Sequence, residues 1–237
     1  MTDGSHATGC LVCGAELLYL AASEPMTCAL CSGARPSAAR CASGHFVCDA
    51  CHSAPANDLI ERTCAAAEDV DPVALAVRLM RHPSVKMHGP EHHFLVPAVL
   101  LAAHCNAKGA PGRRAELIRE ARRRSEPVLV GFCGLQGACG AGIGTGIFVA
   151  LATGSTPLLG TQRGLANQMT ARALDVVSRT GGARCCKRDS FLAILAAARF
   201  ATEHLGVALP ARGPDCERSG TNGECLEEDC PFHRPRH

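Results

Sequence analysis

The pattern of apolar and polar positions divides the chain into a long helical middle and two polar, cysteine-rich ends. Between residues 55 and 210, apolar residues recur with the spacing of an amphipathic α-helix. This period predicts helices over 55–68, 72–81, 90–106, 113–125, 140–153, 161–179 and 187–205. We therefore expect a mainly α fold in three parts: an N-terminal module over residues 9–54, a helical core domain over 55–210 and a short cysteine-rich tail over 211–237.

Local signals mark some ends of these helices. Asp71 before Pro72 is typical of a helix start, because an N-cap carboxylate accepts backbone N–H bonds and proline suits the first turn. Gly206 is a common residue just beyond a helix end. Pro97 lies inside the apolar stripe of the helix over 90–106, where it predicts a kink.

Composition limits the location and the partners. The net charge is +2, and residues 9–54 carry only Arg35 and Arg40 as basic residues, so the charge pattern does not favour nucleic acid as a partner. Trp is absent and Tyr occurs once, which leaves almost no aromatic stacking platform. The first ten residues lack the features of a secretory leader, and the apolar run 143–160 is too interrupted to span a bilayer. We expect a cytoplasmic protein with no membrane contact.

Sixteen cysteines are the most informative part of the composition. Without an export signal, so many cysteines indicate metal binding or thiol chemistry rather than a disulfide scaffold. The N-terminal module holds four closely spaced ligand pairs: Cys10/Cys13, Cys28/Cys31, Cys41/His45 and Cys48/Cys51.

Eight such ligands suit two tetrahedral zinc ions. Sequential pairing of the four pairs would give a ribbon followed by a second knuckle, whereas alternate pairing would give a cross-braced module. We favour alternate pairing. The competing interpretation is a cluster of reduced, buried cysteines without metal.

The tail carries three further candidate metal ligands, Cys216, Cys225 and Cys230, followed by His233. Together with His233 they could form one more tetrahedral zinc site. They could equally hold three corners of an iron–sulfur cluster whose fourth ligand lies elsewhere. The sequence leaves both possibilities open.

Reactive side chains also gather where three of the predicted helices begin. Two thiols frame the glycine-rich stretch GFCGLQGACGAGIGTG, two adjacent thiols lie in GGARCCKRDSF, and three imidazoles lie in MHGPEHH. A helix N-terminus carries positive potential and favours the thiolate, and the neighbouring basic residues Arg184, Lys187 and Arg188 would act in the same direction.

If these three starts meet, they form a pocket lined by thiols and imidazoles. The candidate catalytic or cluster-binding residues are Cys133, Cys139, Cys185, Cys186 and His92, and the candidate cofactor contacts are Gly140, Gly142, His88 and His93. Glycine N–H groups would point at a bound inorganic group or anion. Alternatively, the glycines allow tight helix packing and single cysteines are core filler, which is the interpretation we favour for Cys64 and Cys105.

Two other motif interpretations are weaker. GAGIGTG is similar to the first turn of a methyltransferase or dinucleotide fold, but no clean strand precedes it and no acidic strand end follows. HGPEH fits the H-x-x-E-H pattern of inverted zinc peptidases. Gly89 and Pro90 between the two histidines argue against the shared helical face that this pattern needs.

Several of these segments in combination resemble one family, domain of unknown function 5714. They are the CxxC pairs with CxxxHxxCxxCH, MHGPEHHFLVPAVLL, GFCGLQGACGAGIGTGIF, LANQMT, GGARCCKRDSFLAI and the CPF tail. Family members often carry valine where this chain has Phe132 before Cys133. The resemblance covers nearly the whole chain and implies a metalloprotein of anaerobic bacteria or archaea, sometimes found beside methyltransferases and radical-type enzymes. It implies no established reaction.

Three hypotheses follow for the function. The first is an enzyme or a carrier of sulfur or electrons, whose core thiols bind an iron–sulfur cluster or react directly, with a redox or sulfur-transfer protein as partner. The second is a non-catalytic zinc adaptor that docks a protein partner through its N-terminal module. The third is an accessory protein of a methyltransferase that uses S-adenosylmethionine. We favour the first.

Overall fold

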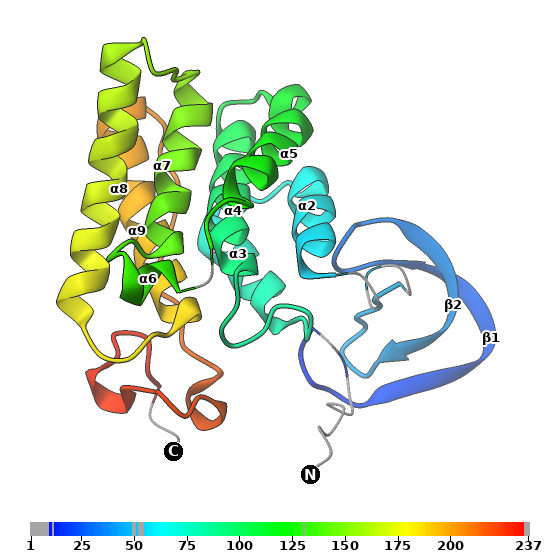
Figure 1. The fold of residues 1–237 in the computed structure, drawn as a ribbon. Helices are drawn as coiled ribbons and strands as arrows, with labels where there is room; N and C mark the ends of the chain where they lie inside the picture. Colours follow the sequence, from blue (N-terminus) through cyan, green and yellow to red (C-terminus); the bar gives the residue numbers. More distant parts are fainter. Residues whose placement is uncertain (1–9, 11, 49–50, 52–54, 130, 235–237) are drawn as a thin grey trace.

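Helices dominate the computed structural model, which describes residues 10, 12–48, 51, 55–129 and 131–234. Residues 9, 11, 49–50 and 52–54 of the predicted N-terminal module and residues 235–237 of the predicted tail lie outside these ranges. Figure 1 shows a bundle of helices, with a small two-stranded sheet on one side near the N-terminus and an irregular C-terminal segment at one end of the bundle. The expected mainly α fold is confirmed.

The helices agree with the periodicity, and two features were not predicted. The helices are α2 (Ala56–Ala66), α3 (Pro72–Arg81), α4 (Glu91–Ala107), α5 (Arg114–Ser125), α6 (Phe132–Leu135), α7 (Gly140–Thr153), α8 (Gly160–Thr180) and α9 (Cys186–Leu205). The short helix α6 was not expected. Nor was the antiparallel hairpin of β1 (Leu17–Thr27) and β2 (Ala34–Cys41), whose pairing shifts register between Tyr19 and Glu24.

Helix α4 forms the centre of the core. It is apolar on all sides and packs against α2, α3, α5, α7 and α9. It runs through Pro97 as one continuous helix, so the proline does not end it. The predicted cap of α3 is present, because the Asp71 carboxylate accepts N–H bonds from Val73 (2.8 Å) and Ala74 (3.1 Å).

The glycines of α7 allow close helix packing. A Cβ added at Gly144 would lie 2.8 Å from Pro97 Cδ on α4, and one at Gly142 would lie 2.7 Å from Leu174 Cδ2 on α8. A Cβ at Gly140 would enter the ring of His93. Alternate glycines in GAGIGTG therefore let α7 approach α4 and α8 closely.

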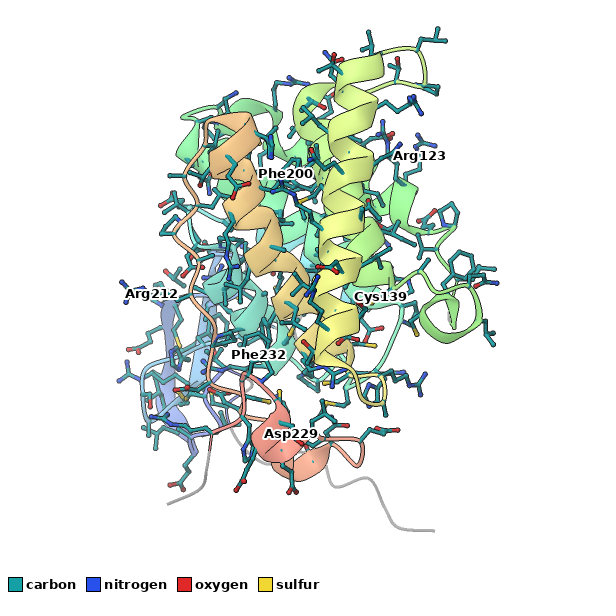
Figure 2. The ribbon with its side chains drawn as sticks, turned by 90° about the vertical axis from the view of Figure 1, so that its left-hand side faces the viewer. Arg123, Cys139, Phe200, Arg212, Asp229 and Phe232 are labelled. Carbon is teal, nitrogen blue, oxygen red and sulfur yellow. The ribbon has the colours of Figure 1, made fainter. Side chains whose placement is uncertain are left out.

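The C-terminal segment, residues 211–234, folds back onto the end of the bundle where α9 begins (Figure 1). Phe232 is buried and packs edge-on against Phe191 of α9, with ring centroids 5.6 Å apart. Arg81 at the end of α3 forms an ion pair with Glu217. Figure 2 shows Cys139 and Phe232 toward this end and Phe200 toward the opposite one.

None of the helices in the described residues combines the length and the apolar character that crossing a membrane requires.

Candidate metal centres and thiol site

The first candidate metal centre consists of Cys10, Cys13, Cys41 and His45, whose ligand atoms all lie within 4.8 Å of one another. Cys13 Sγ is 3.9 Å from Cys41 Sγ, and His45 Nδ1 is 3.3 Å and 3.5 Å from these two sulfurs. A tetrahedral zinc ion would separate two sulfurs by about 3.8 Å and a sulfur and a nitrogen by about 3.6 Å. The four ligands can therefore hold one metal ion with little movement.

The second centre consists of Cys28, Cys31, Cys48 and Cys51, again within 4.8 Å of one another. Cys31 Sγ lies 3.9 Å from Cys48 Sγ. This group is more deeply placed, since Cys28, Cys48 and Cys51 belong to the main hydrophobic core together with residues of α2 such as Leu59.

The two centres draw on alternate ligand pairs. The first and third pairs along the chain form one centre, and the second and fourth form the other. This is the cross-braced arrangement that we favoured over sequential pairing. The hairpin of β1 and β2 carries the chain between the centres, with Cys28 just after β1 and Cys41 at the end of β2.

Backbone N–H groups point at several of these sulfurs. The N–H groups of Val12, His45 and Cys48 donate to the sulfurs of Cys10 (3.4 Å), Cys41 (3.2 Å) and Cys28 (3.4 Å). The Ala15 N–H and the His45 ring lower the pKa of Cys13 to about 6. Such donors stabilise thiolates, the form in which cysteine binds metal.

A third group of cysteines lies where the C-terminal segment meets α9. Cys185, the N-cap of α9, lines one small cavity together with Cys216, Cys225 and Cys230 of the tail. The tail cysteines thus meet a core thiol, Cys185, which is a candidate for the fourth ligand that the sequence could not locate. His233, the alternative fourth ligand, does not line this cavity.

Three of these four sulfurs also receive N–H bonds. The N–H groups of Arg188, Arg218 and Glu227 lie 3.5, 3.4 and 3.3 Å from the sulfurs of Cys185, Cys216 and Cys225. The Asn222 amide is 3.6 Å from Cys185 Sγ. The pattern matches that of the two N-terminal centres, but the sulfurs are farther apart. Among the described residues, only the two N-terminal groups bring three or more ligand atoms within 4.8 Å of one another.

The three helix starts do meet, as the hypothesis required. The ring of His93 at the start of α4 fills the space beside Gly140 at the start of α7. The Gly89 N–H donates to the sulfur of Cys186 in the first turn of α9, and this sulfur is close enough to Cys139 for the two thiols to influence each other's ionisation.

The expected lowering of thiol pKa values is wrong for Cys139, Cys185 and Cys186. Burial raises the pKa of Cys185, although the N–H and the charge of Arg188 oppose it. Burial, with the nearby Asp189 carboxylate, raises the pKa of Cys186 to about 11. Burial and Asp189 also raise the pKa of Cys139. Desolvation of the thiolate outweighs the helix N-termini and the basic neighbours.

The three histidines have different environments. His92 is fully enclosed: one ring nitrogen is 3.0 Å from the Lys86 carbonyl, the other is 3.4 Å from Ser190 Oγ, and burial lowers its pKa to about 3. With both nitrogens engaged inside the core, its geometry favours a structural role over the predicted catalytic one. His93 donates from Nδ1 to the Val128 carbonyl (2.9 Å).

His88 connects the core to the tail. Its Nε2 lies 2.9 Å from the Glu224 carboxylate and 3.2 Å from Asn222 Oδ1. Its Nδ1 is buried and has no hydrogen-bond partner in the described part of the chain. An imidazole nitrogen without a hydrogen-bond partner is available as a ligand.

An open pocket of about 600 Å³ lies near the start of α9, where Arg184, Arg188 and Asp189 line it. Its walls are the loop that carries Cys133 and Cys139, the end of α8 and the first turn of α9 with its buried Arg188–Asp189 ion pair. Cys133 is exposed and Cys139 is half-buried. Arg188 was predicted only as a basic neighbour that favours the thiolate. Its buried ion pair with Asp189 was not predicted, and the only signal in the sequence was the position of both residues shortly after the cysteine pair.

Gly140 and Gly142, the predicted cofactor contacts, are explained by packing instead. Their missing side chains make room for His93 and Leu174, and neither residue lines the open pocket. GAGIGTG lies inside α7 rather than in a loop after a strand. The methyltransferase-like or dinucleotide-like interpretation of this motif is therefore wrong for this fold.

Residues 60–233 match the model of a family described as a family of unknown function, DUF5714, and the chain belongs to this family. The match spans the helical core and the C-terminal segment together and leaves out the cross-braced module. No curated protein and no solved structure matches the chain. The family resemblance expected from the motifs is confirmed, and the function has to be inferred from the sites.

Proposed function

We propose that this protein is an iron–sulfur redox protein with a separate two-zinc module. In this proposal Cys185, Cys216, Cys225 and Cys230 bind the cluster, and the two N-terminal centres bind structural zinc. The observation that carries the proposal is the single cavity shared by the core thiol and the three tail thiols. Four cysteines are the usual ligand set of such clusters.

The spacing of the sulfurs favours a cluster over a zinc ion. One ion needs all its sulfurs about 3.8 Å apart. The ligand atoms of each N-terminal centre lie within 4.8 Å of one another, and those of the tail cavity do not. In a cluster of four irons each cysteine binds a different iron, so the thiolates lie farther apart. The cavity is small, about 20 Å³. This volume is the space that atoms can occupy at non-bonded distances from the walls. A metal bound to the thiolates would lie only about 2.3 Å from the sulfurs, so it can use space that the volume does not include.

The surroundings of the cavity support a redox cluster. Lys187, Arg188 and Arg218 line it, and cations near a cluster stabilise its added negative charge on reduction. Met87, Phe191, Leu226 and Phe232 cover the remaining walls and limit contact with water. All sixteen cysteines are free, which fits a reducing compartment such as the cytoplasm.

The adaptor hypothesis remains the second candidate, because the hairpin of the cross-braced module lies to one side of the helical bundle and most of its residues are exposed (Figure 1). It predicts two or three zinc ions, no iron and no visible absorption band. It also predicts that core cysteines can be replaced at small cost.

The test is the metal and acid-labile sulfide content of protein purified without oxygen, with its visible spectrum. Iron and sulfide in near-equal amounts beside about two zinc ions per chain would support the proposal. Cys185→Ser should lose the iron and the visible band and keep the zinc. Cys105→Ser is the matched control, since Cys105 lies in α4 away from every candidate centre and should leave the spectrum unchanged. Zinc alone in the wild-type protein would refute the cluster.

A further inference from the structure

The open pocket beside the proposed cluster contains two thiols of unequal accessibility. Cys133 on α6 is exposed, whereas Cys139 at the start of α7 is half-buried, and both line the pocket. Thiol–disulfide exchange uses this arrangement: the accessible thiol attacks the substrate disulfide, and the more protected thiol then breaks the mixed disulfide that has formed.

The backbone brings the two cysteines together. The Ala138 N–H donates to the Phe132 carbonyl (3.1 Å), and Cys133 and Cys139 directly follow these two bonded residues. Gly131 and Gly137 adopt positive φ (91° and 64°) and turn the chain so that this loop closes. Two cysteines at the neck of a closed loop can form a disulfide with a local rearrangement of that loop.

Gly134 lies between the two cysteines and has no structural reason to be glycine. Its φ is not left-handed, and a Cβ added there would meet nothing within 4 Å. It nevertheless lines the pocket. In contrast to the glycines of α7, which make room for other helices, Gly134 leaves space that a ligand can occupy.

The charged residues of the pocket indicate what kind of ligand it takes. Asp175 forms an ion pair with Arg179, and Asp189 forms one with Arg188. Arg184 is exposed and has no ion pair within the described residues, so it is available to a carboxylate. The volume of about 600 Å³ is that of a small-molecule site.

We propose that Cys133 and Cys139 form a redox-active dithiol that reduces a small, carboxylate-bearing disulfide bound in this pocket. The Cys133 thiolate attacks one sulfur of the substrate, which breaks the substrate S–S bond, forms a mixed disulfide and releases the first thiol. The Cys139 thiolate then attacks Cys133 Sγ, forms the Cys133–Cys139 disulfide and releases the second thiol. Two electrons pass from the dithiol to the substrate, and the two protons leave on the product thiols.

Regeneration of the dithiol rests on the proposed function. The disulfide needs two electrons and two protons, and the cluster would deliver the electrons one at a time after receiving them from an external one-electron donor protein. Arg188 lines both the cluster cavity and the open pocket, so the two are neighbours. A short separation of this kind suits electron transfer between them.

The exchange step is tested on full-length, reduced protein with oxidised glutathione as the probe and cystamine, a cationic disulfide, as its comparison. After alkylation of free thiols, trypsin releases residues 125–163 as one peptide, which contains Cys133 and Cys139 and no other cysteine. We expect this peptide to form an internal disulfide, with two molecules of glutathione released for each oxidised chain. Cys139→Ser should stop at the mixed disulfide on Cys133, and Cys133→Ser should not react at this peptide.

Two pocket variants separate specific binding from general thiol reactivity. Gly134→Leu should slow the reaction with oxidised glutathione about tenfold, corresponding to about 1.4 kcal/mol, and leave alkylation of Cys133 by iodoacetamide unchanged. Arg184→Gln should remove the preference for oxidised glutathione over cystamine. A wild-type protein that never closes the Cys133–Cys139 disulfide, or one whose rate is unaffected by either variant, would overturn the proposal.

The cluster is tested separately. Dithionite added to the oxidised protein should restore the two thiols in the wild type and not in Cys185→Ser, with Cys225→Ser as the second variant if Cys185→Ser does not fold. Equal recovery in these variants would refute the role of the cluster and leave the dithiol standing. If the exchange step fails in protein that contains iron and sulfide, the dithiol proposal is refuted and the proposed cluster stands.

Discussion

Replacement of Gly144 by alanine tests whether close helix packing explains the glycine pattern of α7. Gly144 is buried inside the helix, where alanine would normally stabilise by about 1 kcal/mol. A Cβ there would lie 2.8 Å from Pro97 Cδ, 3.1 Å from the His93 carbonyl oxygen and 3.2 Å from Val96 Cβ. A proline ring and a backbone carbonyl cannot rotate away, so α4 and α7 must separate.

The cost of such overpacking is typically about 1–3 kcal/mol. After subtraction of the gain in helix propensity, we expect Gly144→Ala to lower the free energy of unfolding by about 0–2 kcal/mol, instead of raising it by about 1 kcal/mol. Gly142→Ala should be milder, because its contact is the end of the flexible Leu174 side chain.

The matched control is Gly164→Ala. Gly164 lies inside α8, is exposed and has nothing within 4 Å of an added Cβ, so alanine should stabilise by about 1 kcal/mol. The assay is urea unfolding at constant metal content, followed by circular dichroism, with the denaturant slope checked for constancy. If Gly144→Ala is as stable as Gly164→Ala, the packing explanation is refuted, and the glycines need a functional explanation after all.

Three further outcomes are expected. Burial lowers the pKa of His104 from 6.5 to about 4, so between these pH values the folded state keeps the ring neutral while the unfolded state binds a proton. The free energy of unfolding therefore falls as the pH drops from 6.5 towards 4. His104→Phe should reduce this loss by about 1.4 kcal/mol per pH unit, which urea unfolding at several pH values would measure. Asp71→Ala should lower the free energy of unfolding by about 1 kcal/mol through loss of the α3 cap, and Asp71→Asn should keep most of this stability. Cys48→Ser should lower the melting temperature of the helical core more than Cys41→Ser, because Cys48 packs in the main core and Cys41 in a small separate cluster; equal effects in calorimetry would contradict this.

The helical core was predictable because its helices carry the local signals that decide helix formation. Amphipathic spacing, the Asp71 cap and Gly206 place α3 and α9 within a residue or two. The hairpin lacked such signals: neither β1 nor β2 alternates cleanly, and their pairing is irregular. Instead, Cys28 just after β1 and Cys41 at the end of β2 belong to the two candidate metal centres, and the way these centres fix the hairpin is visible only in the folded structure.

The ligand pairs of the N-terminal centres were predictable for the same local reason, since a CxxC or CxxxH spacing presents two ligands to one ion. The identity of the fourth cysteine beside the tail was not predictable. Cys185 and Cys216 are brought together by the packing of Phe232 on α9, which no local pattern in the tail encodes. The sequence also does not show which glycine lines the pocket and which allows helix packing. Gly134 and Gly144 lie in the same glycine-rich stretch and differ only in what surrounds them.

The adjacent cysteines at the start of α9 contact two different parts of the structure. Cys185 is the N-cap of α9 and has an extended backbone, whereas Cys186 is the first residue of the helix, and the two side chains make different contacts. Cys185 lines the cavity shared with the tail, and Cys186 accepts the N–H of Gly89 at the start of α4. The pair therefore belongs at the junction of the tail, α4 and α9, and a change at either cysteine should affect a different one of these contacts. This geometry, rather than the helix dipole or the basic flank, explains why two thiols stand side by side at this point of the chain.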